Sequence, residues 1–274
     1  MLFAKKNLTL SRQRSLALGL SLCALLSSVG CSRSLNPQAD AKGSGETGTL
    51  TIVANGESFA QEGLLSKDQW QLNFDHVFVT LEQVAASETS FIKTPNHQPP
   101  ILIAEAKTVD LATSDSTVAT LEVPAKHYRG LQWKLVPASE GDSQGNSLLL
   151  QGQANKADQT IQFSIGFDSD ILFACGDYVG DARKGVVSAN DTAELEATFH
   201  LDHLFGNGDA PAEDSINQKS LGFNTFASLA TNGTLDVSID DLKSQLPPQE
   251  YGQLIQQLIG LGHVGEGHCE GQVT

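Results

Sequence analysis

The sequence predicts a mainly β fold, an antiparallel β-sandwich with a short helical C-terminal appendage. Two observations carry this prediction. Short segments in which apolar and polar residues alternate, the period of a half-buried strand, recur between residues 48 and 201, and turns rich in Pro or Gly separate them. After residue 201 the pattern changes, and the apolar residues that follow have helical spacing. We therefore expect a β-sandwich domain over residues 48–205 and a helical extension packed on it over residues 206–274.

The expected strands follow one another closely along the chain. The longest, residues 70–84, has apolar residues at even positions before Asp75 and at odd positions after it, and this change of parity predicts a bulge. The strand over residues 193–201 alternates throughout, with Leu195, Ala197 and Phe199 pointing inward. The remaining expected strands lie at residues 48–53, 118–123, 131–136, 148–151 and 160–167.

Three helical segments are expected near the C-terminus. The first covers residues 221–230 and ends at an Asn-Gly pair. Ser238 or Asp240 is expected to cap the second, because side chains of these types accept hydrogen bonds from the free N–H groups of a first turn. Pro248 suits the first turn of the third, residues 249–261, since its missing N–H is not needed there.

The first thirty residues have the three parts of a secretory signal peptide. A basic region precedes an apolar stretch at residues 16–26, small residues follow, and Cys31 comes next. The apolar stretch is shorter than the roughly 20 residues that a membrane-spanning helix needs. The arrangement resembles the lipobox of bacterial lipoproteins, although Ser28 stands where that family usually has Leu. The resemblance implies cleavage before Cys31 and lipid on its thiol; an ordinary signal peptide cut nearby and an uncleaved anchor are the alternatives.

Residues 31–47 are expected to form a flexible tether, because they are rich in small and polar residues and poor in apolar ones. Ser32, directly after the cysteine, resembles the signal for outer-membrane delivery in enteric bacteria. We therefore expect a lipid-anchored protein of the cell envelope, on the outer membrane and facing the periplasm or the cell surface. The net charge of −15 argues against nucleic acid as a partner, since phosphate binding requires a basic surface.

Two stretches resemble bacterial lipoprotein domains that have a prealbumin-like sandwich. Residues 77–84 match the V-x-V-T-h-x-x-V strand of those domains, in which h is hydrophobic. Residues 121–131 match their L-x-x-P-A-x-x-Y-x-x-L strand–turn–strand element. The same two elements occur in periplasmic copper-binding proteins of the MbnP type. The resemblance implies the fold more than an activity, and it supplies no metal ligand that can be matched residue by residue.

Cys175 and Cys269 are the only cysteines left in the expected mature chain, because Cys23 leaves with the signal peptide and Cys31 carries the lipid. In an oxidising compartment, an even pair predicts a disulfide. Its loop would contain roughly ninety residues, and closing it is worth about 4 kcal/mol in the chain-entropy model. The alternative is a pair of thiolates that bind a metal.

His200, Asp202 and His203 end the last expected strand. On a strand, His200 and Asp202 share the polar face with Glu194 and Glu196, and such a row of carboxylates with an imidazole can bind a divalent cation. His203 joins the row only if the chain turns there. The alternative is an exposed polar face that binds nothing.

His263, Glu266 and His268 form a second cluster after the last expected helix. Glycines let the backbone curl tightly there, and a disulfide at Cys269 would bring this tail to the sandwich, where the two clusters could meet. Three or four imidazoles with a carboxylate suit Zn2+ or Cu2+. The alternative is a C-terminal cap whose histidines make local hydrogen bonds.

An acidic loop at residues 206–215 offers oxygen ligands for Ca2+ from Asp209, Glu213 and Asp214, but without the spacing of an EF-hand loop. A solvated acidic loop is the alternative there. The chain also lacks the H-E-x-x-H and Walker motifs of common enzymes. Residues 141–145 spell G-x-S-x-G and residues 43–48 and 260–265 spell G-x-G-x-x-G, but none of them stands between an expected strand and an expected helix, as the hydrolase and dinucleotide-binding motifs require.

The sequence therefore predicts a non-catalytic envelope lipoprotein, anchored in the membrane by lipid, that binds zinc or copper through its clustered histidines. The alternative is a structural or interaction module of the cell envelope that binds a polymer or a partner protein. A metallohydrolase is the third hypothesis, because a histidine site with an open position on the metal can activate water.

Overall fold

Thirteen strands form one continuous sheet in the computed structural model, which describes residues 45–93 and 100–274. The signal peptide, Cys31 and nearly all of the expected tether lie outside the described residues, so the lipidation of Cys31 stays a prediction. Within the described ranges, no helix combines the length and the apolar character that crossing a membrane requires.

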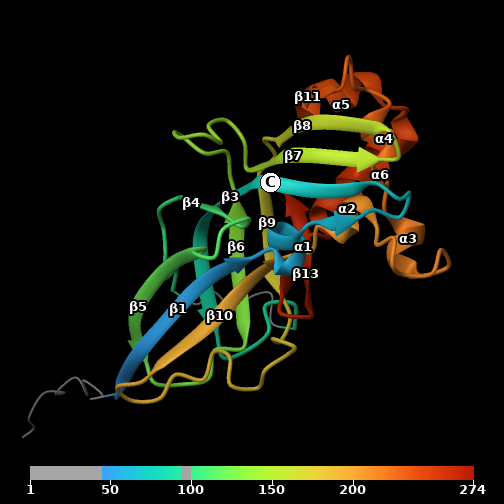
Figure 1. Cartoon of the computed structure of the whole chain (residues 1–274). Coiled ribbons are helices and arrows are strands. Elements are labelled where there is room, and N and C mark those ends of the chain that lie inside the picture. Colours follow the sequence, from blue (N-terminus) through green and yellow to red (C-terminus); the bar gives the residue numbers. More distant parts are fainter. Residues whose placement is uncertain (1–44, 94–99) are drawn as a thin grey trace, which may run out of the picture. The chain divides into compact units, whose positions relative to one another are not determined.

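The main path through the sheet is β11-β8-β7-β3-β6-β9-β13-β12-β10-β1-β5, with β2 and β4 attached to β3. The sheet curls into a half-barrel (Figure 1). Its strands are β1 (Thr47–Asn55), β2 (Leu64–Leu65), β3 (Gln71–Ser87), β4 (Lys107–Asp110), β5 (Thr117–Pro124), β6 (Gly130–Leu135), β7 (Leu148–Lys156), β8 (Gln159–Phe167), β9 (Ile171–Cys175), β10 (Thr192–Phe199), β11 (Thr234–Val237), β12 (Gly262–Val264) and β13 (Gly267–Val273).

The prediction of a mainly β fold is confirmed, but the sheet is mixed and does not form the expected antiparallel sandwich. β1 pairs with β10 in parallel, and β8 pairs with β11 in parallel. β13 joins β9 on one side and β12 on the other, so the sheet continues where a sandwich would divide into two. Alternation reveals which side of a strand is buried, but not its direction relative to a strand that is distant in sequence.

The parallel pair β1 and β10 determines where the chain places its polar groups. Each strand buries its alternate apolar residues, among them Leu50 and Ile52 in β1 and Leu195 in β10. The two strands stay in register up to the pair Asn55 and Thr198. Because they run in the same direction, their carboxyl ends lie side by side, and the segments that leave them begin at one place.

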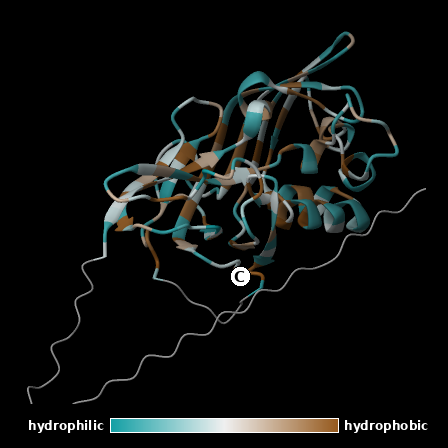
Figure 2. Cartoon of the chain, turned by 90° about the horizontal axis from the view of Figure 1, so that it is seen from below, coloured by the Kyte–Doolittle hydropathy of each residue, from teal (hydrophilic) through white to brown (hydrophobic). Residues whose placement is uncertain are grey.

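The helices are α1 (Glu57–Glu62), α2 (Asp202–Phe205), α3 (Ser215–Lys219), α4 (Asn224–Ala227), α5 (Ile239–Gln245) and α6 (Pro248–Ile259). They carry both hydrophobic and hydrophilic residues (Figure 2), and α6 buries Leu254 and Leu258. Aromatic side chains join this region to β8, since the ring centroids of Phe163 and Phe223 are 5.6 Å apart. Burial of such rings is a large favourable contribution to folding.

Local sequence signals explain several breaks between elements. The register of β3 with β7 shifts between Phe74 and His76, which confirms the bulge predicted at Asp75. Ser238 caps α5 through a reciprocal capping box with Asp241. Of the two predicted caps, Ser238 and Asp240, the first is therefore the correct one. Pro248 occupies the first turn of α6.

Residues 206–274 differ from the expected helical appendage, because they supply β11, β12 and β13 as well as α3 to α6. They belong to the same compact unit as the rest of the described residues. The β12–β13 hairpin is too rich in glycine to show strand alternation, and it forms because β9 and β10 provide hydrogen-bonding edges for it. The helix expected at residues 221–230 is limited to α4.

Candidate metal centre

The chain turns directly after β10, and this turn brings two histidines together. His200 follows Phe199, the last residue of β10, and α2 begins at Asp202. The backbone N–H of His203 donates to the carbonyl of His200 at 3.1 Å, and the two ring centroids are 5.6 Å apart. The turn that His203 needs in order to join His200 in one cluster is therefore present.

The β12–β13 hairpin adds a third histidine. In β12, His263 pairs with Thr198 of β10 on one side and with His268 of β13 on the other. The ring centroid of His263 is 3.9 Å from that of His200 and 5.1 Å from that of His203. Two segments that are distant in sequence, each predicted as a candidate cluster, thus meet at one point.

His200, His203 and His263 form a group that could hold a metal ion. One ligand atom from each ring lies within 4.8 Å of the others. Nitrogens bound to one tetrahedral zinc ion at 2.0–2.1 Å would be about 3.4 Å apart, so side-chain movements of about 1 Å would complete the geometry. Three protein ligands would leave one position on the metal open.

Buried polar atoms without hydrogen-bond partners gather at this point. Six such side-chain atoms occur in the described residues, and four of them belong to Thr198, His200, Asp202 and His263. In the two imidazoles the unpartnered atoms are Nε2 of His200 and Nδ1 of His263. A buried polar group without a partner costs about 1–3 kcal/mol, so natural proteins rarely collect several of them without a reason. A bound metal ion would satisfy the imidazole nitrogens directly.

Carboxylates surround the imidazoles. Asp202 is the first residue of α2, and Glu57 is the first residue of α1, with its Oε2 at 3.8 Å from Nδ1 of His200. Burial raises the pKa of both carboxyl groups above the ordinary range, and the charge of Glu266, in the β12–β13 turn, adds to the rise. The centre therefore combines nitrogen donors with oxygen donors.

The environment keeps His203 and His263 in the neutral form. Burial, together with the neighbouring His200, lowers the pKa of His203 to about 4. Burial likewise lowers the pKa of His263 to about 3, with contributions from His200 and His203. Neutral imidazole is the form that binds metals, so at neutral pH no proton competes for these two rings.

Some predicted site residues lie outside the three-histidine group. His268 is exposed; its ring centroid is 4.8 Å from that of His263, but its nitrogens are not among the mutually close ligand atoms. Glu266 is exposed in the hairpin turn. Glu194 and Glu196 do not join His200 as expected, because both bind Lys184, with Nζ at 2.5 Å from Oε1 of Glu196.

The acidic loop at residues 206–215 has a structural role. The carboxylate of Asp214 caps α3, accepting from the backbone N–H of Ile216 at 3.0 Å. Asp209 and Glu213 are exposed. In the described part of the chain, only the three histidines form a group of converging ligands, so the calcium alternative receives no support from the geometry.

Cys175 and Cys269 form the predicted disulfide between β9 and β13. Both sulfurs are therefore engaged, and the alternative of two metal-binding thiolates is excluded for this form. The bond lies one residue beyond His268, at the base of the hairpin that carries His263. It attaches the C-terminal histidines to the sheet, as the sequence suggested.

Glu57 was not predicted as a site residue. No histidine or cysteine lies near it in the sequence, and its carboxylate shares no spacing pattern with either histidine cluster. The parallel pairing of β1 with β10 brings it to His200, and that pairing has no local signal in the sequence. In the structure, Glu57 also has an unusual backbone conformation, with a positive φ of 54°.

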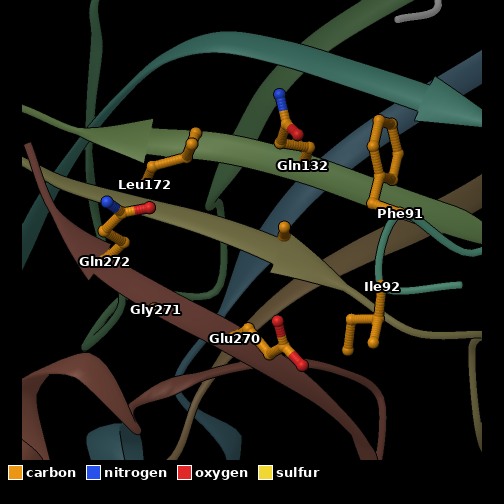
Figure 3. Close-up of a pocket in the computed structure, with 8 residues that line it drawn as sticks. Phe91, Ile92, Gln132, Leu172, Glu270, Gly271 and Gln272 are labelled. Carbon is orange, nitrogen blue, oxygen red and sulfur yellow. The ribbon is translucent and has the colours of Figure 1, made fainter. Parts of the chain in front are cut away.

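A separate groove of about 580 Å³ lies on β6, β9 and β13 (Figure 3). Its lining contains the polar side chains of Gln132, Glu270 and Gln272 together with Phe91 and Leu172. None of the three clustered histidines lines it. The groove and the histidine group are therefore distinct features.

Comparison of the chain with protein-family models, with curated proteins and with solved structures finds no match. The functional interpretation consequently depends on the residues and geometry of the histidine centre.

Proposed function

We propose that the chain is a lipid-anchored, non-catalytic protein of the cell envelope that binds a divalent transition metal, zinc or copper, through His200, His203 and His263. The convergence of these three imidazoles, two of which have buried and unpartnered nitrogens, carries the proposal. Imidazole suits zinc and copper among the common biological metals. The neighbouring carboxylates would offset part of the positive charge of the ion.

Calorimetric titration of the metal-free protein tests this function. We expect one Zn2+ or Cu2+ ion to bind per chain, and we expect His200→Ala, His203→Ala and His263→Ala each to remove that binding. His127→Ala changes an exposed histidine and serves as the matched control. If the wild-type protein binds neither ion, metal binding is wrong, and the interaction module that binds a polymer or a partner protein becomes the better explanation.

The anchoring part of the proposal depends on Cys31. Cys31→Ser is expected to prevent incorporation of labelled fatty acid and to move the protein from the membrane fraction to the soluble fraction. Cys23→Ser, within the same signal segment, is the control and is expected to leave both properties unchanged. Retention of the Cys31→Ser variant in the membrane fraction without lipid would show that another segment anchors the chain.

A further inference from the structure

The parallel pair β1 and β10 delivers Glu57 to His200. The two strands are in register at Asn55 and Thr198, and Glu57 and His200 each lie two residues beyond that pair. Segments that leave the carboxyl ends of neighbouring parallel strands begin at the same edge of a sheet, which is where such sheets commonly build sites. Oε2 of Glu57 consequently lies 3.8 Å from Nδ1 of His200.

The backbone at Glu57 adopts a conformation that glutamate rarely occupies. Its φ of 54° lies in the left-handed region, which glycine enters without cost and residues with a Cβ do not. The side chain of Asn55 holds the turn, since its Oδ1 accepts from the backbone N–H of Glu57 at 2.8 Å. Strained residues of this kind persist when the surroundings enforce them, and they gather at functional sites.

The two ring nitrogens of His200 have different surroundings. Nδ1 faces the carboxylate of Glu57, whereas Nε2 is buried and has no hydrogen-bond partner. A histidine that binds a metal through one nitrogen commonly donates the N–H of the other to a carboxylate, which fixes its tautomer and the orientation of its ring. The charged or titratable groups that act on Glu57 are His200, Asp202 and Glu266.

We propose that Glu57 is a positioning residue of the metal centre: its carboxylate, 3.8 Å from Nδ1 of His200, favours a proton on that nitrogen electrostatically, so that Nε2 of His200 points toward the ion. This inference rests on the proposed metal binding. It explains why a glutamate occupies a position that glycine would fill more easily. It also assigns to α1, which contains neither of the predicted clusters, a role in the centre.

Substitutions at Glu57 separate positioning from a merely structural role. Glu57→Gly removes the carboxylate and relieves the backbone, so Zn2+ affinity is expected to fall by about 10–100-fold while the melting temperature of the metal-free protein stays the same or rises. Glu57→Gln keeps an acceptor without the charge, and its loss of affinity is expected to be smaller. Unchanged Zn2+ affinity in Glu57→Gly would overturn the proposal.

Two control variants match these changes. Glu62→Gln neutralises another carboxylate of α1, an exposed one, and is expected to keep the wild-type Zn2+ affinity. Gln83→Gly relieves another positive φ, of 51°, in a bulge of β3, and is expected to change stability but not affinity. A loss of affinity in Gln83→Gly equal to that in Glu57→Gly would show that backbone relief alone disturbs the centre, against the proposal.

The tautomer of His200 provides a measurement that does not require metal. Nitrogen chemical shifts of the imidazole in the metal-free protein are expected to show a proton on Nδ1 in the wild type and a mixture of tautomers in Glu57→Gly. A proton on Nε2 in the wild type would contradict the role of Glu57 whether or not metal binds. If instead the wild type shows the expected tautomer and binds no Zn2+, the proposed function fails while the contact between Glu57 and His200 stands.

Discussion

The polar residues in the middle of β10 and those at its C-terminal end have different surroundings. Glu194 and Glu196, in the middle of the strand, form ion pairs with Lys184, so other groups of the protein compensate their charges. Thr198 and His200, at the end of the strand and just beyond it, are buried and have side-chain atoms without partners. The difference shows that a row of polar residues alone does not mark a candidate site, whereas several buried and unpartnered polar atoms close to converging imidazoles do.

Neighbouring elements produce this difference. Lys184, in the loop before β10, reaches the glutamates, whereas α2, the end of β1 and the β12–β13 hairpin surround the end of the strand. These last elements contribute imidazoles and carboxylates, and no lysine or arginine of the described residues forms an ion pair with them. The end of β10 is therefore suited to a positive ion, whereas the two glutamates in the middle of the strand already share the ammonium group of Lys184.

The largest expected effect compares a change beside the C-terminal end of β10 with a change in the middle of that strand. His263→Leu removes a ligand and is expected to abolish Zn2+ binding, whereas Glu196→Gln is expected to leave the affinity unchanged. Without metal, His263→Leu is expected to cost little stability, because it also removes a buried nitrogen that has no partner. Calorimetric titration and thermal unfolding measure the two quantities. Equal loss of Zn2+ affinity in both variants would end the distinction between the two regions.

Removal of the disulfide is expected to have the next largest effect, mainly on the free energy of unfolding. The double variant Cys175→Ala, Cys269→Ala is expected to lower the free energy of unfolding by about 4 kcal/mol, because the closed loop restricts the unfolded chain. It is also expected to weaken Zn2+ binding, since the hairpin that carries His263 loses its covalent attachment. Urea denaturation of the metal-free protein measures the first effect. An unfolding free energy equal to that of the wild type would show that the bond does not hold the hairpin.

Lowering the pH is expected to destabilise the metal-free protein through the histidine centre. His203 and His263 have folded-state pKa values of about 4 and about 3, below the ordinary value of 6.5. Between pH 6.5 and these lowered values, the unfolded chain therefore binds more protons than the folded protein. Their contribution to stability is complete above pH 6.5 and is lost as the pH falls toward 4 and 3. From pH 7 to pH 5 the loss is expected to be roughly 2 kcal/mol in total, after allowance for partial solvent contact.

The variant His203→Ala, His263→Ala is the control for this pH dependence. It is expected to unfold with a smaller change in stability between pH 7 and pH 5 than the wild type shows. The same pH dependence in both proteins would assign the effect to other groups.

The smallest effect is expected for the middle of β10, where the glutamates are paired with Lys184. Lys184→Met breaks both ion pairs near the surface, and the free energy of unfolding is expected to fall by about 1 kcal/mol or less. Zn2+ affinity should not change, because the ion pairs of Lys184 are with the two glutamates and not with the histidines. A clear change in metal affinity would mean that the two regions of β10 are coupled.

Sequence patterns sufficed for features that depend on local chemistry. Alternation marked the buried face of β10, parity located the bulge in β3, and the capping residue Ser238 located the start of α5. The disulfide followed from counting the cysteines of the expected mature chain, and the histidine clusters followed from their density. These signals do not depend on how distant strands pair.

The features that sequence reasoning missed depend on tertiary pairing. The direction of β1 relative to β10 results from contacts between strands far apart in the chain, and no period in the sequence encodes it. Glu57 reaches His200 only because of that pairing. Glu194 and Glu196 were assigned to the site for a related reason, since alternation placed them on the right face but could not show that Lys184 binds them.

Anomalous diffraction from crystals of the protein grown with Zn2+ tests the central claim most directly. Data collected on both sides of the zinc absorption edge are expected to give a peak between the ring nitrogens of His200, His203 and His263, with Nε2 of His200 facing it. No peak at this position in zinc-loaded crystals, or a peak only at the acidic loop of residues 206–215, would contradict the claim that His200, His203 and His263 form a metal centre beside the end of β10.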